Sequence, residues 1–269
     1  MKAIYKRLKP LKSLFKPKNH RVKVHFLVCG VQKSGTTSFD YYLRQHPQIC
    51  MPSNLKEVHF FDRDRLFKYW SDKLIYPFYH SNFDPQKHHK IIGEVTPIYS
   101  YWNPTMSRIW KYNSKMKIIL ILRNPIRRAF SHWQMSKKSG HEKHSFYEAI
   151  TQETLRARSR LPRQSIKNSY IDRGLYVEQI RKIKRFFPNE QILFIKSEDL
   201  KEDTEATLTE LAQFLDVKPF PKLNKVELNQ NSNKLELDIP SQKILLDKFY
   251  FEIKEIEKEL NWDLSDWLQ

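Results

Sequence analysis

Four short segments of the chain are continuously apolar, the pattern of strands that are buried on both faces of a parallel sheet. The first segment runs into a glycine, and the third contains the longest unbroken apolar run of the chain. The predicted strands are Val24–Cys29, Lys90–Glu94, Lys117–Leu122 and Gln191–Lys196.

Helical patterns lie between and after these strands, with apolar residues recurring every three or four positions. The predicted helices span residues 36–45, 104–112, 126–137, 145–158, 173–186, 203–215 and 241–260. Strands that alternate with helices predict an α/β fold, a three-layer sandwich around a central, mainly parallel sheet. Because no internal repeat or clear linker is apparent, we expect one domain, residues 24–269, preceded by a basic N-terminal arm, residues 1–23.

The composition is that of a globular protein, with 40% apolar and 13% aromatic residues in a chain of 269. Its formal net charge of +18 favours a polyanionic partner but does not identify one. Half of this excess lies in residues 1–23, which contain nine basic residues and no acid. The charge alone would also suit a nucleic-acid-binding protein. No recognised basic-helix or aromatic-platform motif is present, so we expect no nucleic-acid partner.

The two cysteines, Cys29 and Cys50, are too few for a disulfide framework and have no metal-ligand spacing. The longest apolar run, residues 118–122, is too short to span a membrane, and the arm lacks the apolar stretch of a signal peptide. We therefore expect a cytoplasmic protein that needs no metal. Apolar residues at helical spacing in residues 1–20 allow weak peripheral contact with an anionic membrane at its inner face; a solvated arm interrupted by Pro10 explains them equally well.

Residues Gly30–Ser38 (GVQKSGTTS) connect a predicted strand to a predicted helix, a setting in which backbone N–H groups and the helix N-terminus bind phosphate. An ordinary helix N-cap accounts for the hydroxyl residues but not for Lys33 between two glycines. The candidate phosphate-binding residues are Lys33, Ser34, Gly35, Thr36, Thr37 and Ser38.

This loop differs from the nucleoside-triphosphatase pattern G-x-x-x-x-G-K-[ST], because Thr36 stands where that pattern has lysine. The strand Lys117–Leu122 leads into Arg123 and not into the carboxylate that a magnesium-bound triphosphate needs. A P-loop kinase is therefore the weaker alternative. Arg123 and the nearby hydroxyl of Ser131 suit a phosphate monoester, so two phosphate sites fit a nucleotide with 5′- and 3′-phosphates.

Together the two motifs resemble the sulfotransferases that use 3′-phosphoadenosine 5′-phosphosulfate (PAPS), particularly the carbohydrate branch with its heparan sulfate sulfotransferase domains. Gly30–Ser38 resembles the family's P-loop-like 5′-phosphosulfate loop, and Ile121–Ser131 its 3′-phosphate motif. Residues 56–62 (KEVHFFD), 93–99 and 174–200 agree as well. The resemblance implies PAPS as donor, a hydroxyl or amine of a carbohydrate-type acceptor, and in-line displacement without metal.

By this resemblance Glu57 corresponds to the base that activates the acceptor, and Lys33 to the lysine that assists the leaving phosphate. Partial burial would help Glu57 by raising its pKa. If this segment is extended, His59 points to the same side and assists or orients Glu57; a packed histidine is an equal alternative. Glu94 is a rival base, although a structural carboxylate paired to lysine or arginine is the favoured interpretation.

Two positions depart from the family pattern. Val95 stands where some glycan-directed members have a lysine, which removes that lysine's contribution. Residues 229–234 lack the glycine that is common in the corresponding late loop, so their contact with the nucleotide is left open.

Overall fold

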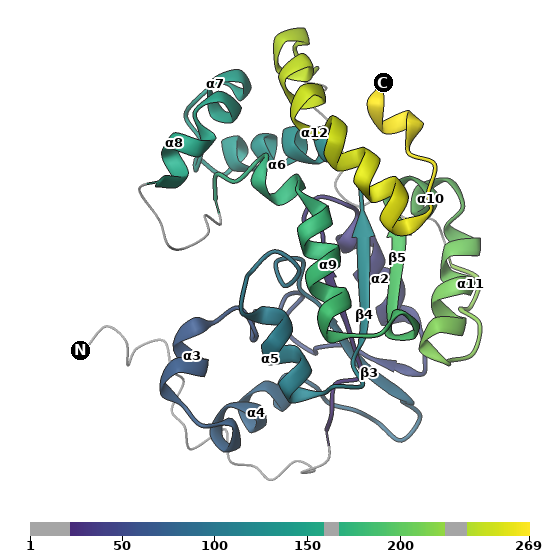
Figure 1. The fold of residues 1–269 in the computed structure, drawn as a ribbon. Helices are drawn as coiled ribbons and strands as arrows, with labels where there is room; N and C mark the ends of the chain where they lie inside the picture. The colour runs from purple at the N-terminus through teal and green to yellow at the C-terminus, as the bar shows by residue number, and fades with distance from the viewer. Residues whose placement is uncertain (1–21, 159–166, 224–235) are drawn as a thin grey trace.

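The computed structural model describes residues 22–158, 167–223 and 236–269 and confirms the predicted α/β fold. Its central sheet is entirely parallel, with the strand order β2-β3-β1-β4-β5 (Figure 1). The strands are β1 (Phe26–Gly30), β2 (Ile49–Cys50), β3 (Ile91–Val95), β4 (Lys117–Leu122) and β5 (Ile192–Lys196). Four of them correspond to the predicted strands, and β2 is too short to leave a pattern in the sequence.

Helices connect the strands and cover the sheet. They are α2 (Thr36–Gln45), α3 (Asp64–Tyr69), α4 (Asp72–His80), α5 (Thr105–Tyr112), α6 (Pro125–Lys138), α7 (Phe146–Thr151), α8 (Glu153–Arg158), α9 (Tyr176–Phe186), α10 (Ser197–Glu202), α11 (Thr204–Leu215) and α12 (Ile239–Leu260). The single helix predicted over 145–158 is two helices, because α7 ends before Gln152. Short 3₁₀ turns occur at Asp172–Gly174, Asn189–Gln191 and Ser265–Leu268.

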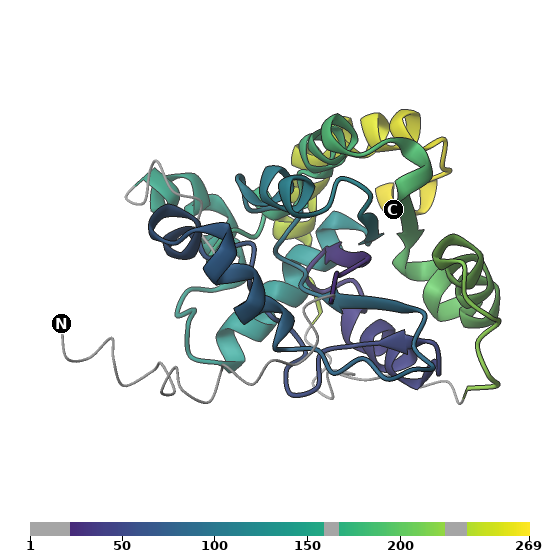
Figure 2. The ribbon, with the colours of Figure 1, turned by 90° about the horizontal axis from the view of Figure 1, so that it is seen from below.

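The side chains of β4 show how the three layers form. Ile118 and Leu120 pack into the core beneath α5, α6, α9 and α12, whereas Ile119 and Ile121 pack into the core beneath α2 and α11. Neighbouring residues of a strand point to opposite faces, so a strand covered on both sides must be apolar throughout. Figures 1 and 2 show α9 and α12 on one side of the sheet and α2 on the other.

Parallel pairing brings the carboxyl ends of β1, β3 and β4 to one edge of the sheet. Leu27 of β1 is in register with Glu94 of β3 on one side and with Ile118 of β4 on the other. The loops that follow these three strands therefore lie close together, which is where ligands bind in open α/β sheets. None of the helices in the described ranges is long and apolar enough to cross a membrane.

The close packing of β3 against β1 can be tested at Gly93. A Cβ atom at this position would lie 2.2 Å from the ring of Phe26. We expect Gly93→Ala to lower the free energy of unfolding by about 1–3 kcal/mol, the usual cost of overpacking, as measured by urea denaturation. In a Phe26→Leu background the penalty should shrink. An equal penalty in both backgrounds would show that the contact with Phe26 is not its cause.

Candidate active site

The loop between β1 and α2 has the geometry expected of an anion-binding loop. Lys33 and Gly35 adopt positive φ angles of 78° and 92°, and the buried hydroxyl of Ser34 donates to the carbonyl of Val31 at 2.6 Å. Gly35 is the N-cap of α2, and no described side chain caps this helix. The alternative in which Thr or Ser caps the first turn is therefore wrong. The first-turn N–H groups, which include those of Thr36, Thr37 and Ser38, have no capping side chain and are available to a ligand.

Arg123 lies directly beside this loop. It follows β4, the neighbour of β1, and its Nη1 donates to the carbonyl of Lys33 at 2.8 Å. Burial lowers the pKa of Lys33, and the positive charges of Arg123 and Lys56 lower it further. The two predicted phosphate sites are therefore adjacent. The positive charges of Lys33 and Arg123 repel each other, and a bound anion would reduce this repulsion.

Ser131 lies in the second turn of α6 and is partly buried. The N-terminus of this helix differs from that of α2, because the Asn124 side chain accepts the N–H groups of Ile126 and Arg127 at 2.9 and 3.3 Å. Of these two helix N-termini, only that of α2 has uncapped donors. The contact of Ser131 with a phosphate stays a prediction.

The segment after β2 brings Glu57, His59 and Asp62 into one group. The Nε2 atom of His59 lies 3.1 Å from Glu57 Oε2, and its Nδ1 atom lies 2.9 Å from Asp62 Oδ2. His59 adopts a positive φ of 52°, so the backbone is not extended at this residue, although the contact with Glu57 does form. The side chain of His59 is 41% exposed, which excludes the packed-histidine alternative.

These contacts set the charges of the group. Hydrogen bonds to Asp62 and then to Glu57 raise the pKa of His59 to about 9, so the ring is positively charged at neutral pH. Burial alone would raise the pKa of Glu57, but the hydrogen bond from His59 and the charge of Lys56 together lower it. The rise in pKa that would have helped Glu57 as a base therefore does not occur, and Glu57 is a carboxylate at neutral pH.

Lys56 connects this group to the first turn of α2, directly after the predicted phosphate-binding loop. Its Nζ donates to Thr37 Oγ1 at 2.7 Å and lies 3.3 Å from Glu57 Oε1. The proposed base and the first turn of α2 thus share one cationic partner, although they belong to different segments of the chain.

Glu94 stabilises the segment that follows Glu57 through a network of hydrogen bonds. It is fully buried and accepts hydrogen bonds from the hydroxyls of Tyr79, Thr96 and Tyr99 at 2.7, 2.8 and 3.1 Å. The Thr96 oxygen in turn accepts the backbone N–H of Val58, and the Tyr99 oxygen accepts those of Phe60 and Phe61. The expected pairing of Glu94 with lysine or arginine is wrong, because hydroxyls surround it. Burial raises its pKa to about 7, and its contacts are those of a structural carboxylate.

Sequence reasoning assigned no role to Lys56, Asp62 or Arg173. Asp62 follows His59 by three residues within KEVHFFD, and this spacing could have indicated a His–Asp contact. Lys56 is adjacent to the predicted base. Arg173 gave no such signal, because its partner in the loop, Gln32, is 141 residues away in the sequence.

These features define the class of the protein: the chain belongs to the sulfotransferase domain family, whose family model matches residues 23–243. It is 27% identical to the membrane-associated sulfotransferase kil1 of Dictyostelium discoideum, over 72% of this chain and 56% of that protein. It is 31% identical to the human bifunctional heparan sulfate N-deacetylase/N-sulfotransferase 3, over 72% of this chain and 22% of that protein. The predicted resemblance is thereby confirmed, including the carbohydrate-directed branch.

A solved structure agrees with this assignment. The crystal structure of a sulfotransferase from Alicyclobacillus acidocaldarius superposes with a TM-score of 0.77 at 26% identity and covers 92% of this chain and all of that one. The aligned region spans little more than half of kil1 and less than a quarter of the human enzyme.

The comparisons contradict the expected cytoplasmic location, because kil1, a relative that aligns with most of this chain, is described as membrane-associated. The expectation relied on the cysteine content, on the short apolar runs and on the lack of a signal-peptide stretch in residues 1–23. None of these features determines where the folded domain is held. Residues 1–20, the predicted membrane-contacting arm, lie outside the described residues.

The charge state of His59 gives a direct test of the Glu57–His59–Asp62 group. We expect Asp62→Asn to lower the pKa of His59 from about 9 toward 6.5, because the largest stabilisation of the protonated ring is lost. An NMR titration of the imidazole would measure this change. Asp64→Asn is the matched control, because Asp64 pairs with Arg108. A His59 pKa that does not move in Asp62→Asn would contradict the assigned contact.

The same shift predicts a pH dependence of stability. A pKa raised on folding means that the folded state holds the His59 proton more tightly than the unfolded state does. The resulting stabilisation is complete below pH 6.5 and is lost as the pH rises through about 9. Urea unfolding at several pH values should show this loss in the wild type and a smaller one in Asp62→Asn. Parallel curves for the two proteins would contradict it.

Proposed function

We propose that this protein transfers a sulfuryl group from PAPS to a hydroxyl or amine of a carbohydrate-type acceptor. The observation that carries the proposal is the position of Lys56, which contacts both Thr37 in the first turn of α2 and Glu57. A donor held by the loop and an acceptor held at Glu57 would therefore meet at one place. Family membership and the heparan sulfate relatives support the reaction and the acceptor class.

On the donor side, Lys33 and the N–H groups of the loop would hold the 5′-phosphosulfate. As the bond between sulfur and the bridging oxygen breaks, negative charge develops on that oxygen, and preorganised cations and N–H donors stabilise it. The positive end of α2 adds the equivalent of about half a charge. Arg123 and Ser131 would bind the 3′-phosphate, with Arg123 already oriented by its contact with the loop.

On the acceptor side, Glu57 would take the proton while the acceptor oxygen or nitrogen forms its bond to sulfur. Its lowered pKa keeps Glu57 in the ionised, proton-accepting form at neutral pH. His59 is charged and hydrogen-bonded to Asp62, so it would orient Glu57 and would not compete for the acceptor proton.

Ligand binding is the first test of the proposal. Adenosine 3′,5′-bisphosphate, the product nucleotide, should stabilise the protein without magnesium. At a concentration of 100 Kd the gain is about 2.7 kcal/mol, which corresponds to a rise in Tm of about 5–10 °C. Differential scanning fluorimetry measures this shift. Stabilisation by Mg-ATP but not by the bisphosphate would instead favour a kinase.

Two substitutions separate the proposed base from the proposed donor site. Glu57→Gln should lower kcat at least 100-fold, as loss of a general base does, and should leave the affinity for the bisphosphate within about twofold. Lys33→Ala should weaken both transfer and nucleotide binding. Labelled PAPS, assayed with desulfated glycans and small alcohols as acceptors, provides the measurement.

Glu190→Gln, which changes an exposed carboxylate after α9, is the matched control and should behave as the wild type. A fully active Glu57→Gln enzyme would remove Glu57 as the base. Unchanged nucleotide affinity in Lys33→Ala would remove Lys33 from the donor site.

A further inference from the structure

Two neighbouring buried arginines, Arg173 and Arg128, lack full sets of hydrogen-bond partners among the described residues. Arg173 is 4% exposed and Arg128 is 0% exposed. The Nε and Nη2 atoms of Arg173 and the Nε and Nη1 atoms of Arg128 have no acceptor among the described residues. Arg128 uses its Nη2 atom to bond the backbone carbonyl of Tyr170. Buried charged groups that lack partners are costly, so their presence calls for a reason.

Arg173 contacts the loop between β1 and α2, and the charge of Glu57 influences its pKa. Its Nη1 atom donates to Oε1 of Gln32, the residue before Lys33, and its guanidinium carbon lies 5.0 Å from the centre of the Tyr101 ring. Burial and the charge of Arg128 lower the pKa of Arg173 to about 10, whereas the charge of Glu57 acts in the opposite direction. The Arg173 guanidinium therefore interacts with the loop through Gln32 and electrostatically with Glu57.

The turn that carries Arg173 is held firmly. A single carboxylate, that of Glu153 in α8, accepts the backbone N–H groups of Tyr170, Ile171 and Asp172 at 2.7, 2.8 and 2.9 Å. A hydrogen bond from the hydroxyl of Tyr101 occupies the Asp172 side chain. The two acids beside the arginines thus accept hydrogen bonds from neutral donors, and no ion pair of either with Arg173 or Arg128 occurs in the described structure.

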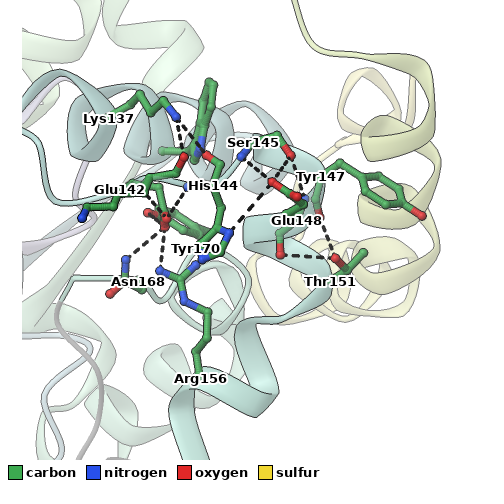
Figure 3. Close-up of polar contacts among 12 residues, drawn as sticks. Lys137, Glu142, His144, Ser145, Tyr147, Glu148, Thr151, Arg156, Asn168 and Tyr170 are labelled. Carbon is green, nitrogen blue, oxygen red and sulfur yellow. Dashed lines mark hydrogen bonds and ion pairs between the residues drawn. The ribbon is translucent and has the colours of Figure 1, made fainter.

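A second buried carboxylate fixes the start of the same segment. Glu142 accepts hydrogen bonds from Arg156 of α8, from Asn168 and from the hydroxyl of Tyr170, at 2.9, 3.1 and 2.8 Å (Figure 3). The segment 168–172 is thereby anchored by both Glu142 and Glu153. Arg173 follows it directly, so its backbone has little freedom to move away from the loop.

We propose that Arg173, with Arg128 behind it, forms an oxyanion subsite that takes an anionic oxygen of the reactants in place of the Gln32 carboxamide oxygen. The inference rests on the proposed sulfuryl transfer. Gln32 is a neutral acceptor, and a guanidinium binds an anionic oxygen more strongly, often through two parallel N–H donors. The oxyanion belongs either to the sulfuryl group in transfer or to an acidic group of the acceptor.

A ligand-binding arginine and a structural arginine predict opposite effects of substitution on the stability of the ligand-free protein. When a buried arginine serves stability, its removal breaks bonds and destabilises the fold. When it awaits a ligand, its removal relieves an unpaired buried charge. We therefore expect the ligand-free Arg173→Met protein to have a Tm at or above that of the wild type.

The experiment compares Arg173→Met and Arg173→Lys with the wild type, and Arg181→Met serves as the control. Arg181 is a half-exposed arginine of α9 that pairs with Glu255 and Glu259. The measurements are the ligand-free Tm, the Kd for adenosine 3′,5′-bisphosphate, the Kd for PAPS without acceptor, and kcat and KM for the acceptor.

In Arg173→Met we expect kcat/KM to fall about 100-fold, the effect of losing one oxyanion donor, while bisphosphate affinity stays within twofold. Arg173→Lys should recover part of the activity, because it keeps the charge. If the oxyanion is the sulfuryl group, PAPS binding weakens relative to bisphosphate binding. If it is an acidic group of the acceptor, PAPS binding is unchanged and KM rises for an acidic acceptor but not for a neutral one.

Two results would overturn the subsite. One is a set of kinetic and binding constants in Arg173→Met that stay within twofold of the wild type. The other is a lowered ligand-free Tm with equal losses of bisphosphate and PAPS affinity, which would indicate a structural role.

Failure of the proposed function is a separate outcome. A wild-type protein that neither binds the bisphosphate nor transfers sulfate would refute that function. The subsite would then be decided with inorganic sulfate at an ionic strength matched by chloride. A larger sulfate-dependent rise in Tm for the wild type than for Arg173→Met supports it, and equal rises overturn it.

Discussion

The site depends on one constraint, the parallel pairing of β1 between β3 and β4. With Leu27 in register with both Glu94 and Ile118, the three strands end at the same edge of the sheet. The loop after β1, the Glu94 network at the end of β3 and Arg123 after β4 must then lie together. Backbone hydrogen bonds within a doubly covered, apolar sheet fix this arrangement, so a register shift in β1 would move its loop relative to both Glu94 and Arg123.

The site is cationic because its buried acids accept hydrogen bonds from neutral donors and do not pair with the nearby cations. Glu94 accepts hydroxyl groups, and Glu153 accepts backbone N–H groups. Each acid stabilises the position of a segment, and neither forms an ion pair with the nearby cations. Within the described structure, Lys33 and Arg173 consequently form no ion pair, and burial lowers the pKa of both. In such a partly dehydrated environment an anion interacts with them more strongly than it would in water. The net charge of +18 is thus less informative about function than the few cations that local acids do not neutralise.

The parts of the fold that could be predicted are those in which local pattern and tertiary structure agree. The apolar run of β4 predicted its bounds, and glycines around Lys33 predicted the loop, because both signals lie in adjacent residues. The helices α3 and α4 escaped prediction because they are short and largely exposed. The partners of Glu94 and the position of Arg173 depend on contacts between distant segments, which no periodicity encodes. His59 forms the contact with Glu57 from a left-handed backbone conformation, which the sequence did not indicate.

The charges around Glu57 indicate which interactions would contribute most to the rate enhancement of the proposed reaction. A lowered pKa makes Glu57 a weak base, so it would not remove a proton from a free hydroxyl. An acceptor hydroxyl becomes strongly acidic only as its oxygen bonds to sulfur, and a weak base that is always ionised can then take the proton. Stabilisation of the departing phosphate would therefore carry more of the rate enhancement than the strength of the base. The uncapped first turn of α2 and the ammonium of Lys33 beside Arg123 are suited to that task, because these donors are present before the charge develops.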